Sequence, residues 1–540
     1  MTTHPMTTSS WTHGWWLREQ ADRLGGRRFI VLDDLERSFR EIYEECRAVA
    51  KALRAVGVRP GDLVGVLMPN CLDMLRIVFG AHLLRAVAVP VNARFKRAEL
   101  SRLIPHSDMR ILFTTQAIKE HVDFVALIWD IFTDIERTSA GQALSLKDAP
   151  ELRHIVVTGG EAPPPTVSME AFLARGACAA DSDIDSSVDE ARPDDVAYLL
   201  YTSGTTASPK GCELTHEAVL RAWNAYGDVI ALTEESGLWS PCPFFHIGGL
   251  GPLASALTKG AAFLSMSHFE PESAVAMLEK YRPEHLFPAF PALTLGTLRS
   301  PAFKKERFEF IKTVLNVSPP DAQAVIDTLL PAGTVLLTDF GMTEASGIVT
   351  MSRPQDPTDL RIRSNGRALP GMEIKIVASG STDQVETGVD GEICFRGINT
   401  LRSYYKDPVA TSAAIDAQGW FHTGDRGHLD AHGCLHFVGR IKDMLKVGGE
   451  NVAPAEIESY LSTHPQVKIA QVIGRPDDKY GEVAIAFVEL LPGAHATADE
   501  LIAHCRGHLA NFKVPREVHF VTEWPMSATK IQKYRLAELL

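Results

Sequence analysis

Short apolar runs alternate with amphipathic stretches through the first part of this chain. Apolar residues fill 63–68 and 86–91, and the residues between them, 73–84, have a helical pattern. An earlier helix is expected to start at a capping box formed by Ser38 and Glu41. The apolar residues on one face of that helix are Phe39, Ile42, Cys46, Val49 and Leu53. This strand–helix–strand order predicts an α/β protein with mostly parallel strands and helices outside them.

The alternation continues along the chain and ends in a smaller unit. Strands are expected at 153–157 and 196–201, separated by a polar stretch, 177–193, which we predict to be an exposed connector. After residue 440 the pattern predicts a second α/β unit, in which a capping box of Thr497 and Glu500 begins a helix. Its expected helices and strands lie at 455–462, 467–473, 482–490, 501–509 and 517–521. We therefore predict two domains, at 1–440 and 441–540.

Composition and charge exclude several classes of protein. A chain of 540 residues is too long for one hydrophobic core, and 45% hydrophobic with 22% charged residues is typical of a folded protein. The net charge of −13 argues against general affinity for nucleic acid or anionic membranes. The eight cysteines include no CxxC pair, and no apolar run reaches the length of a membrane span, about 20 residues. Because the start of the chain has no signal-peptide pattern, we expect a cytoplasmic protein.

A hydroxyl-rich loop follows the strand expected at 196–201. It reads YTSGTTASPKGCELTH over residues 201–216. Backbone N–H groups and hydroxyls can surround the oxygens of a polyphosphate, and a lysine adds charge, although such a loop is also typical of an ordinary surface turn. The spacing differs from that of a Walker A loop. The candidate phosphate-binding residues are Thr202, Ser203, Gly204, Thr205, Thr206 and Lys210.

Four later segments carry polar groups that would each, alone, also fit a turn or a solvated surface. Residues 339–344, DFGMTE, offer a ring for a base, a hydroxyl for a phosphate and a carboxylate for Mg²⁺. In residues 419–425, GWFHTGD, Asp425 can accept hydrogen bonds from ribose hydroxyls. Residues 439–452 place charges and a glycine pair at the expected domain boundary, and residues 525–533 place lysines near the chain end.

Taken together and in this order, the five segments resemble the adenylate-forming superfamily of acyl- and aryl-CoA synthetases. The resemblance extends from about residue 30 to residue 540. It implies a large N-terminal domain of mixed and parallel sheets flanked by helices, followed by a small mobile α/β domain. It also implies that the chain uses ATP, Mg²⁺ and coenzyme A.

The resemblance implies a role for the residues that match the nucleotide-binding motifs. The loop from Thr202 to Lys210 would hold the β- and γ-phosphates of ATP, Thr343 the α-phosphate, and Glu344 the Mg²⁺ ion. Asp425 and Arg440 would bind the ribose hydroxyls. The residues implied at the adenine are Phe340, which would lie against the base, with its neighbours Asp339, Gly341 and Met342, and Ser318.

Five further positions are matched to the chemistry and to the change between two half-reactions. Lys530 would bridge the substrate carboxylate and the α-phosphate, and His246 would lie at the carboxylate. Lys442 would be the hinge of the small domain, and the pair Gly448-Gly449 would line the path of the pantetheine arm. The implied reaction joins a carboxylate to AMP with loss of pyrophosphate, and then transfers the acyl group to the CoA thiol with loss of AMP.

Three positions depart from the pattern of the superfamily. Ala207 replaces a glycine of the phosphate loop, which matters if that position needs a positive φ. Thr529 precedes Lys530 where a glycine is usual, which leaves Lys533 as an alternative for the catalytic lysine. The run 316–319, Asn-Val-Ser-Pro, replaces a smaller Gly-Gly-Ala-Pro run, and its bulk is expected to narrow or reshape the acyl site.

The expected substrate is a hydrophobic monocarboxylic acid: fatty, alicyclic, aromatic or a steroid side-chain acid. The residues that would line its pocket are Phe244, Phe245, Ile247, Gly249 and the loop 345–348. The expected partners are this acid, ATP, CoA and, in a homodimer, a second copy of the chain, with neither nucleic acid nor a membrane segment. Three alternatives stay open: acyl loading of a separate carrier protein, a luciferase-like oxidation of the adenylate, and a non-catalytic nucleotide-binding homologue.

Overall fold

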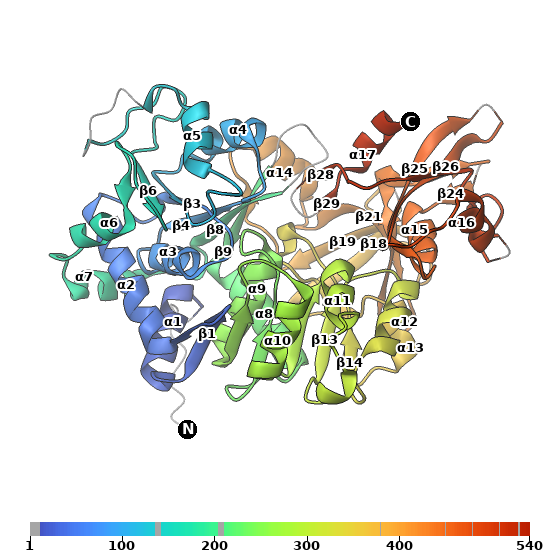
Figure 1. Ribbon diagram of the computed structural model, residues 1–540, viewed down its shortest axis with the longest axis horizontal. Coiled ribbons are helices and arrows are strands. Elements are labelled where there is room, and N and C mark those ends of the chain that lie inside the picture. Colours follow the sequence, from blue (N-terminus) through green and yellow to red (C-terminus); the bar gives the residue numbers. More distant parts are fainter. Residues whose placement is uncertain are drawn as a thin grey trace. The chain divides into compact units, whose positions relative to one another are not determined.

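The computed structural model divides the chain into two compact units. It describes residues 11–135, 142–202, 210–378, 380–448, 450–477, 479–506, 508–527 and 530–540. The first unit comprises Met1–Phe287, Gly341–Ile348 and Ile398–Ala413, and the second Pro288–Phe340, Val349–Gly397 and Ala414–Leu540. Helices and strands alternate through both (Figure 1), so the predicted mixed α/β class is confirmed. The division into these two units does not test the predicted domain boundary at residue 440, which stays a prediction.

The first unit contains most of the helices. They are α1 (His13–Leu24), α2 (Phe39–Ala55), α3 (Leu72–Leu83), α4 (Arg97–Ser107), α5 (Phe124–Ile131), α6 (Met169–Arg175), α7 (Asp181–Glu190), α8 (His216–Val229), α9 (Ile247–Lys259), α10 (Pro271–Tyr281), the 3₁₀ turn η3 (Thr343–Ala345) and, ending at the limit of the unit, α14 (Pro408–Ala414). The capping box predicted for α2 is present: Ser38 Oγ accepts from the Glu41 N–H at 3.2 Å. All five apolar residues predicted on one face of α2 are buried.

Two sheets run through the first unit. The strands are β1 (Arg28–Leu32), β2 (Leu35–Ser38), β3 (Leu63–Leu67), β4 (Val87–Val91), β5 (Ile111–Thr115), β6 (His154–Thr158), β7 (Val167–Ser168), β8 (Val196–Thr202), β9 (Lys210–Thr215), β10 (Gly237–Trp239), β11 (Ala262–Ser265), β12 (His285–Ala289) and β20 (Ser403–Tyr404). One sheet has the order β20-β9-β8-β4-β3-β5-β6-β7, and the other contains β12-β10-β11-β1-β2. As predicted, β3 and β4 are parallel. Both β4 and β5 are buried along their whole length, as expected for parallel strands covered on both faces.

The polar stretch at 177–193 is not the exposed connector that its composition predicts. Residues 181–190 form helix α7. Ile184 and Val188, one helical turn apart, are fully buried, and Asp181 forms an ion pair with Arg47 of α2 at 3.1 Å. Because only two apolar residues form the buried stripe, the surrounding Asp and Ser residues obscured the helical period.

The second unit has six short helices and three 3₁₀ turns among its described residues, besides the end of α14. They are α11 (Pro291–Leu298), η2 (Lys305–Arg307), α12 (Pro320–Leu329), α13 (Thr358–Arg363), η4 (Ile441–Asp443), α15 (Pro454–Ser462), α16 (Ala498–Cys505) and, at the chain end, α17 (Lys533–Leu536) with η5 (Ala537–Leu539). The predicted capping box at Thr497 and Glu500 is present, although α16 ends at Cys505 rather than at residue 509. None of the helices in the described parts of the chain has the length and apolar character of a membrane span.

Antiparallel sheets dominate the second unit. Its strands are β13 (Thr313–Asn316), β14 (Val335–Leu337), β15 (Asp339–Phe340), β16 (Thr350–Met351), β17 (Arg367–Ala368), β18 (Met372–Val377), β19 (Gly391–Gly397), β21 (Phe421–Leu429), β22 (Leu435–Arg440), β23 (Leu445–Val447), β24 (Glu450–Val452), β25 (Val467–Asp477), β26 (Gly481–Leu490), β27 (Glu517–Phe520), β28 (Met526–Ser527) and β29 (Lys530–Ile531). One sheet has the order β18-β19-β21-β22. In the C-terminal part, β26 pairs with β25, β23 and β27, and α15 and α16 contribute Ile457 and Leu501 to the core beneath them.

Candidate active site

The two ends of the predicted phosphate-binding loop lie side by side in the first unit. Strands β8 and β9 are antiparallel neighbours, and Thr202 is the cross-strand partner of Lys210. The Thr202 hydroxyl donates to the Lys210 carbonyl oxygen at 3.4 Å. The two ends of the loop are therefore held together as neighbouring strand ends. The loop residues Ser203, Gly204, Thr205, Thr206 and Ala207 lie outside the described residues.

A tyrosine connects the predicted phosphate-binding lysine to the predicted metal ligand. The Lys210 ammonium lies 4.9 Å from the centroid of the Tyr404 ring, a cation–π contact. The Tyr404 hydroxyl donates to Oε1 of Glu344 at 2.9 Å. Burial, followed by the charge of Glu344, raises the pKa of Tyr404, so that the phenol keeps the proton it donates. The structure thus brings together Lys210 and Glu344, which are far apart in the sequence.

The segment that carries Thr343 and Glu344 makes a tight turn. Thr343 and Glu344 form the 3₁₀ turn η3, and the chain then returns so closely that a Cβ at Gly341 would lie 1.7 Å from the carbonyl oxygen of Gly347. Only glycine permits this approach of the two backbones. The Glu344 carbonyl oxygen also accepts from the Leu401 N–H at 2.7 Å. These contacts fix where Thr343 and Glu344 lie in the first unit.

The loop 345–348, predicted to line the acyl pocket, contacts Trp223 of α8. Its indole N–H donates to the Ser346 carbonyl oxygen at 2.8 Å, and the ring is buried. A Cβ at Gly347, where φ is +112°, would lie 2.7 Å from this ring, and a Cβ at Gly251 of α9 would lie 1.8 Å from it. The indole therefore fills the space between α9 and the loop 345–348. Phe244, Phe245 and Ile247, at and just before the start of α9, are also buried.

His246 occupies the N-cap position of α9. Its backbone is extended there, with φ −117°, and its carbonyl oxygen accepts from Gly249 and Leu250. Its ring lies 4.8 Å from the ring of Phe245, centroid to centroid. The backbone of Phe244, two residues earlier, is held by the side chain of Asn70 at 2.8 Å. His246 and the predicted apolar lining residues are thus held in one turn of the first unit.

In the second unit, the structure brings Phe340 to a second aromatic ring. Phe340 is buried on β15, and its centroid lies 5.9 Å from that of Phe437 on β22, which is 39% exposed. Asn365 joins the two strands: its amide donates to the Asp339 carbonyl oxygen and accepts from the Phe437 N–H, both at 3.0 Å. The side chain of Asp339 is buried, and burial raises its pKa to about 7.

The run 316–319 is held by a buried asparagine. Asn316 is fully buried, and its amide donates to Ser318 Oγ at 2.7 Å and to Gln323 Oε1 at 3.0 Å. The Thr294 hydroxyl donates to the side-chain oxygen of Asn316, Oδ1, at 2.7 Å. The Asn316 side chain is therefore committed to a local network that fixes Ser318, while Val317 is 37% exposed.

Asp425 and Arg440, the residues predicted to bind the ribose, form an ion pair. They are cross-strand partners in β21 and β22, and Oδ1 of Asp425 lies 3.1 Å from Nε of Arg440. The carboxylate is nearly buried, whereas the guanidinium is 40% exposed. Lys442 follows in η4, and burial lowers the pKa of its ammonium. These three residues lie at the point where β22 leads into the C-terminal part of the chain.

The remaining predicted residues lie in the C-terminal part of the second unit. Gly448 has a φ of +61°, a conformation that favours glycine, and its N–H donates to the Tyr480 carbonyl oxygen at 2.7 Å. Gly449 and Thr529 lie outside the described residues, and of Lys530 only the backbone is described, paired with Ser527 in a short hairpin. The alternative lysine, Lys533, forms an ion pair with Glu458 at 2.5 Å. This contact favours Lys530 over Lys533.

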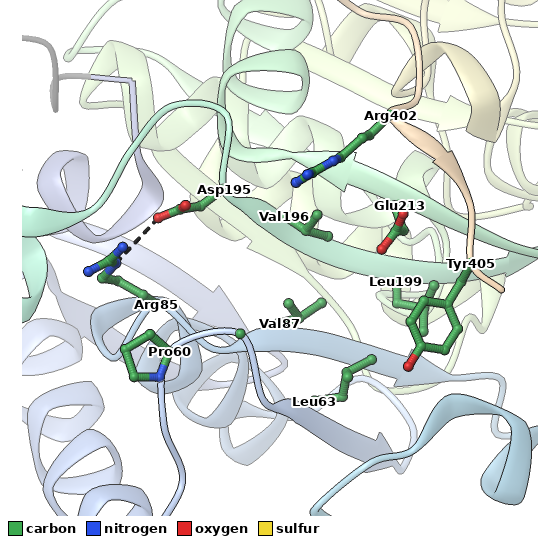
Figure 2. Close-up of a pocket in the computed structure, with 11 residues that line it drawn as sticks. Pro60, Leu63, Arg85, Val87, Asp195, Val196, Leu199, Glu213, Arg402 and Tyr405 are labelled. Carbon is green, nitrogen blue, oxygen red and sulfur yellow. Dashed lines mark hydrogen bonds and ion pairs between the residues drawn. The ribbon is translucent and has the colours of Figure 1, made fainter.

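The first unit also contains a cavity of about 300 Å³. Figure 2 shows its lining, in which Arg85 forms an ion pair with Asp195 at 3.3 Å and Leu63, Val87 and Leu199 form the apolar part. None of the eleven residues that line it is among the predicted site residues. We therefore take the motif residues, and not this cavity, as the candidate active site.

Comparisons with known proteins place the chain in a family. A family model described as AMP-binding enzyme matches residues 17–405, and a model described as AMP-binding enzyme C-terminal domain matches residues 456–530. The chain belongs to the AMP-binding enzyme family. The resemblance to the adenylate-forming superfamily is thereby confirmed.

Relatives of this AMP-binding enzyme match it over nearly its whole length. YngI of Bacillus subtilis (strain 168), which carries a provisional name as an acyl-CoA synthetase, is 33% identical over 98% of the chain and 96% of YngI. A 3-[(3aS,4S,7aS)-7a-methyl-1,5-dioxo-octahydro-1H-inden-4-yl]propanoyl:CoA ligase of Rhodococcus jostii (strain RHA1) is 32% identical over 100% of the chain and 99% of the ligase. These relatives confirm the predicted class of enzyme, an AMP-forming acyl-CoA synthetase that uses ATP and CoA.

A solved structure supports the same assignment. The anthranilate CoA ligase AuaEII, crystallised with anthranoyl-AMP, has a TM-score of 0.85 and 26% sequence identity, with 99% of each chain covered. The bound anthranoyl-AMP in that protein is an acyl-adenylate. At the level of the reaction class, the predicted two-step ligation through an acyl-adenylate is confirmed.

Proposed function

We propose that this enzyme activates a hydrophobic monocarboxylic acid as its acyl-adenylate and transfers the acyl group to CoA. The observation that carries the proposal is the connection of Lys210, Tyr404 and Glu344, because it brings a cation and a carboxylate to the hairpin that bears the phosphate loop. The apolar environment of Trp223, Phe244, Phe245 and Ile247 supports the hydrophobic class of acid.

Glu344 fits the role of a magnesium ligand. Mg²⁺ prefers oxygen ligands and is usually bound by one or two carboxylates together with substrate phosphates. The Glu344 carboxylate is partly exposed, and Tyr404 occupies one of its oxygens. A bound Mg²⁺ would neutralise charge on the phosphates of ATP. The Tyr404 hydrogen bond orients the carboxylate for that role, and Lys210 adds a positive charge beside it.

In the first half-reaction, an oxygen of the substrate carboxylate attacks the α-phosphorus of ATP, and the bond from that phosphorus to the bridging oxygen breaks. Pyrophosphate leaves with the electron pair of that bond. Since two anions must meet, the barrier is largely electrostatic, and we assign Lys530 and Thr343 to stabilise the negative charge at the α-phosphate. Asp425 and Arg440 hold the ribose, and Phe340 lies against the adenine. His246 is assigned to the carboxylate.

In the second half-reaction, the CoA thiol loses its proton to solvent and attacks the acyl carbon, and AMP leaves with the electron pair of the acyl–oxygen bond. Lys530 would obstruct the thiol if it stayed at the carboxylate. We therefore assign Lys442 as the hinge that moves the domain 441–540 between the two half-reactions, and Gly448-Gly449 as the wall beside the pantetheine arm.

The test is pyrophosphate release over a panel of fatty, alicyclic, aromatic and steroid side-chain acids, with and without CoA, with the acyl product identified by mass. We expect an apolar acid to release pyrophosphate and to yield a CoA thioester. An adenylate without a thioester would favour loading of a carrier protein, an oxidised product would favour the luciferase-like reaction, and no turnover on any acid would favour a non-catalytic homologue. A homodimer and a cytoplasmic location stay predictions.

A further inference from the structure

Three side chains with metal-binding atoms converge on the sheet that carries Asp425. Glu392 and Cys394 are two residues apart on β19 and therefore face the same side of the strand. His422 of β21 is the cross-strand partner of Cys394. Between Glu392 and Cys394 the register shifts, because β21 carries an irregularity opposite them. This irregularity lets one histidine reach both residues.

The distances are close to those of a zinc site. Nδ1 of His422 lies 3.4 Å from Sγ of Cys394 and 3.0 Å from Oε2 of Glu392, and the three donor atoms lie within 4.8 Å of one another. With Zn–S near 2.3 Å and Zn–N and Zn–O near 2.1 Å, tetrahedral ligands are separated by roughly 3.4–3.6 Å. The two His422 distances are therefore within about 0.4 Å of the tetrahedral separations, and the third pair, Sγ of Cys394 and Oε2 of Glu392, lies within 4.8 Å.

The outer partners of these groups are also those of a zinc site. Nε2 of His422 lies 3.7 Å from Oδ2 of Asp416, too far for a hydrogen bond here but near enough to form the carboxylate–histidine contact that orients zinc-binding imidazoles. The second oxygen of Glu392 accepts from the Gly424 N–H at 3.0 Å, which leaves Oε2 for a metal. The Gly424 N–H thus fixes the Glu392 carboxylate, and Asp416 places a negative charge beside the imidazole.

Burial and charge favour a metal ligand over a reactive thiol. Cys394 is fully buried beside Val377 and Trp420, so that it is closed to a bulky substrate. The side chains of His422 and Glu392 are 21% and 14% exposed, which leaves a path for an ion and for a water. A thiolate and a carboxylate together neutralise a divalent cation. Two cations lie near the site: the Lys375 ammonium and the Arg396 guanidinium each lie 4.5 Å from the centroid of the Trp420 ring.

We propose that Glu392, Cys394 and His422 bind a zinc ion, with water as the fourth ligand. The ion would tie β19 to β21 directly before Asp425. The site is independent of the proposed ligase reaction, since none of its three ligands has been assigned a role in that reaction.

The test is the zinc content of the purified full-length protein after equilibration with Zn²⁺ and gel filtration. We expect one equivalent by mass spectrometry of the metal, lost in Cys394→Ser and in His422→Gln. Cys434→Ser is the matched control, because Cys434 is an equally buried cysteine of the same unit. Asp416→Asn should weaken zinc binding about 10- to 100-fold, the usual cost of removing a partner outside the metal ligands.

A second measurement keeps the test valid if a variant fails to fold. Co²⁺ added to the unaltered protein should give a thiolate charge-transfer band together with visible bands of tetrahedral cobalt. These bands should persist in Cys178→Ser, which removes an exposed cysteine. The absence of retained zinc, or a cobalt spectrum without a thiolate band, would overturn the proposal, as would equal loss of zinc in Cys434→Ser.

Discussion

At the scale of single residues, Tyr404 carries more of the candidate site than any motif position suggests. It contacts the Lys210 ammonium with its ring and the Glu344 carboxylate with its hydroxyl. Tyr404→Phe should keep the ring and remove the donor. Hydrogen bonds to charged groups contribute about 1.5–3 kcal/mol, so we expect the KM for MgATP in ATP–pyrophosphate exchange to rise about 10-fold or more.

The neighbouring tyrosine supplies the control for this prediction. Tyr405→Phe removes a hydroxyl that donates to Asp108 at 3.1 Å. It should leave the KM for MgATP close to that of the unaltered enzyme. If Tyr405→Phe raised KM as much as Tyr404→Phe, the effect would be a general loss of packing, and the assigned role of Tyr404 would be wrong.

Asp339 makes a prediction about pH. Burial raises its folded-state pKa to about 7, above the value near 3.9 expected in the unfolded chain. Between these values the native state holds a proton that unfolding releases, so this group's contribution to stability falls as pH rises from about 4 to 7. Asp339→Asn cannot ionise. Its gain in melting temperature over the unaltered protein should therefore grow between pH 5 and pH 8, as measured by calorimetry, and parallel pH profiles would contradict the prediction.

Sequence reasoning found the motif residues but not the residues that connect them. Thr202, Lys210 and Glu344 carry recognisable local patterns, whereas Tyr404 and Asn365 lie in segments with no motif. Their roles arise only when strands distant in the sequence pair, as when β20 adds Tyr404 to the edge of β9. The spacing of residues along the chain does not indicate which distant strands pair, so the contacts of Tyr404 could not be predicted from a single sequence.

At the scale of helices and strands, periodicity decided what could be predicted. Helix α2 has a wide apolar stripe, a capping box and one buried face, and its pattern predicts its start correctly. Helix α7 buries two apolar residues among many acidic ones, and its polar composition wrongly indicates a connector. A narrow stripe produces little periodic signal although two buried side chains can still hold a helix in place.

The contact of α8 and α9 with the loop 345–348 gives a prediction about substrate choice. Trp223 fills the space between α9 and this loop. Trp223→Leu should open space beside the predicted acyl site and shift the ratio of kcat/KM values toward bulkier acids. The cavity and the lost hydrogen bond should also destabilise the fold, by on the order of 3 kcal/mol. The measurement is kcat/KM for a homologous series of acids.

A matched variant separates specificity from stability. Trp239 is another fully buried tryptophan of the first unit, on β10. Trp239→Leu should lower the melting temperature to a similar degree and leave the order of acid preferences unchanged. A shift of preference in both variants would show that loosening of the fold, and not the space near the loop, changes the choice of acid.

At the scale of the whole molecule, the proposed reaction needs Lys530 at the carboxylate during adenylation and away from it during thioester formation. A hinge that moves Lys530 between these two positions can therefore be tested by separating the two half-reactions. Lys442 lies in η4, where β22 passes into the C-terminal part of the chain. Lys442→Pro would fix φ there, so it should spare adenylation, measured by ATP–pyrophosphate exchange, and stall thioester formation from supplied acyl-adenylate. Lys442→Ala keeps backbone freedom and should retain both steps.

Lys530→Ala should show the opposite pattern to Lys442→Pro, with adenylation reduced on the order of 10²- to 10³-fold and the thioester step retained. Equal loss of both steps in Lys442→Pro would rule out a hinge at this residue.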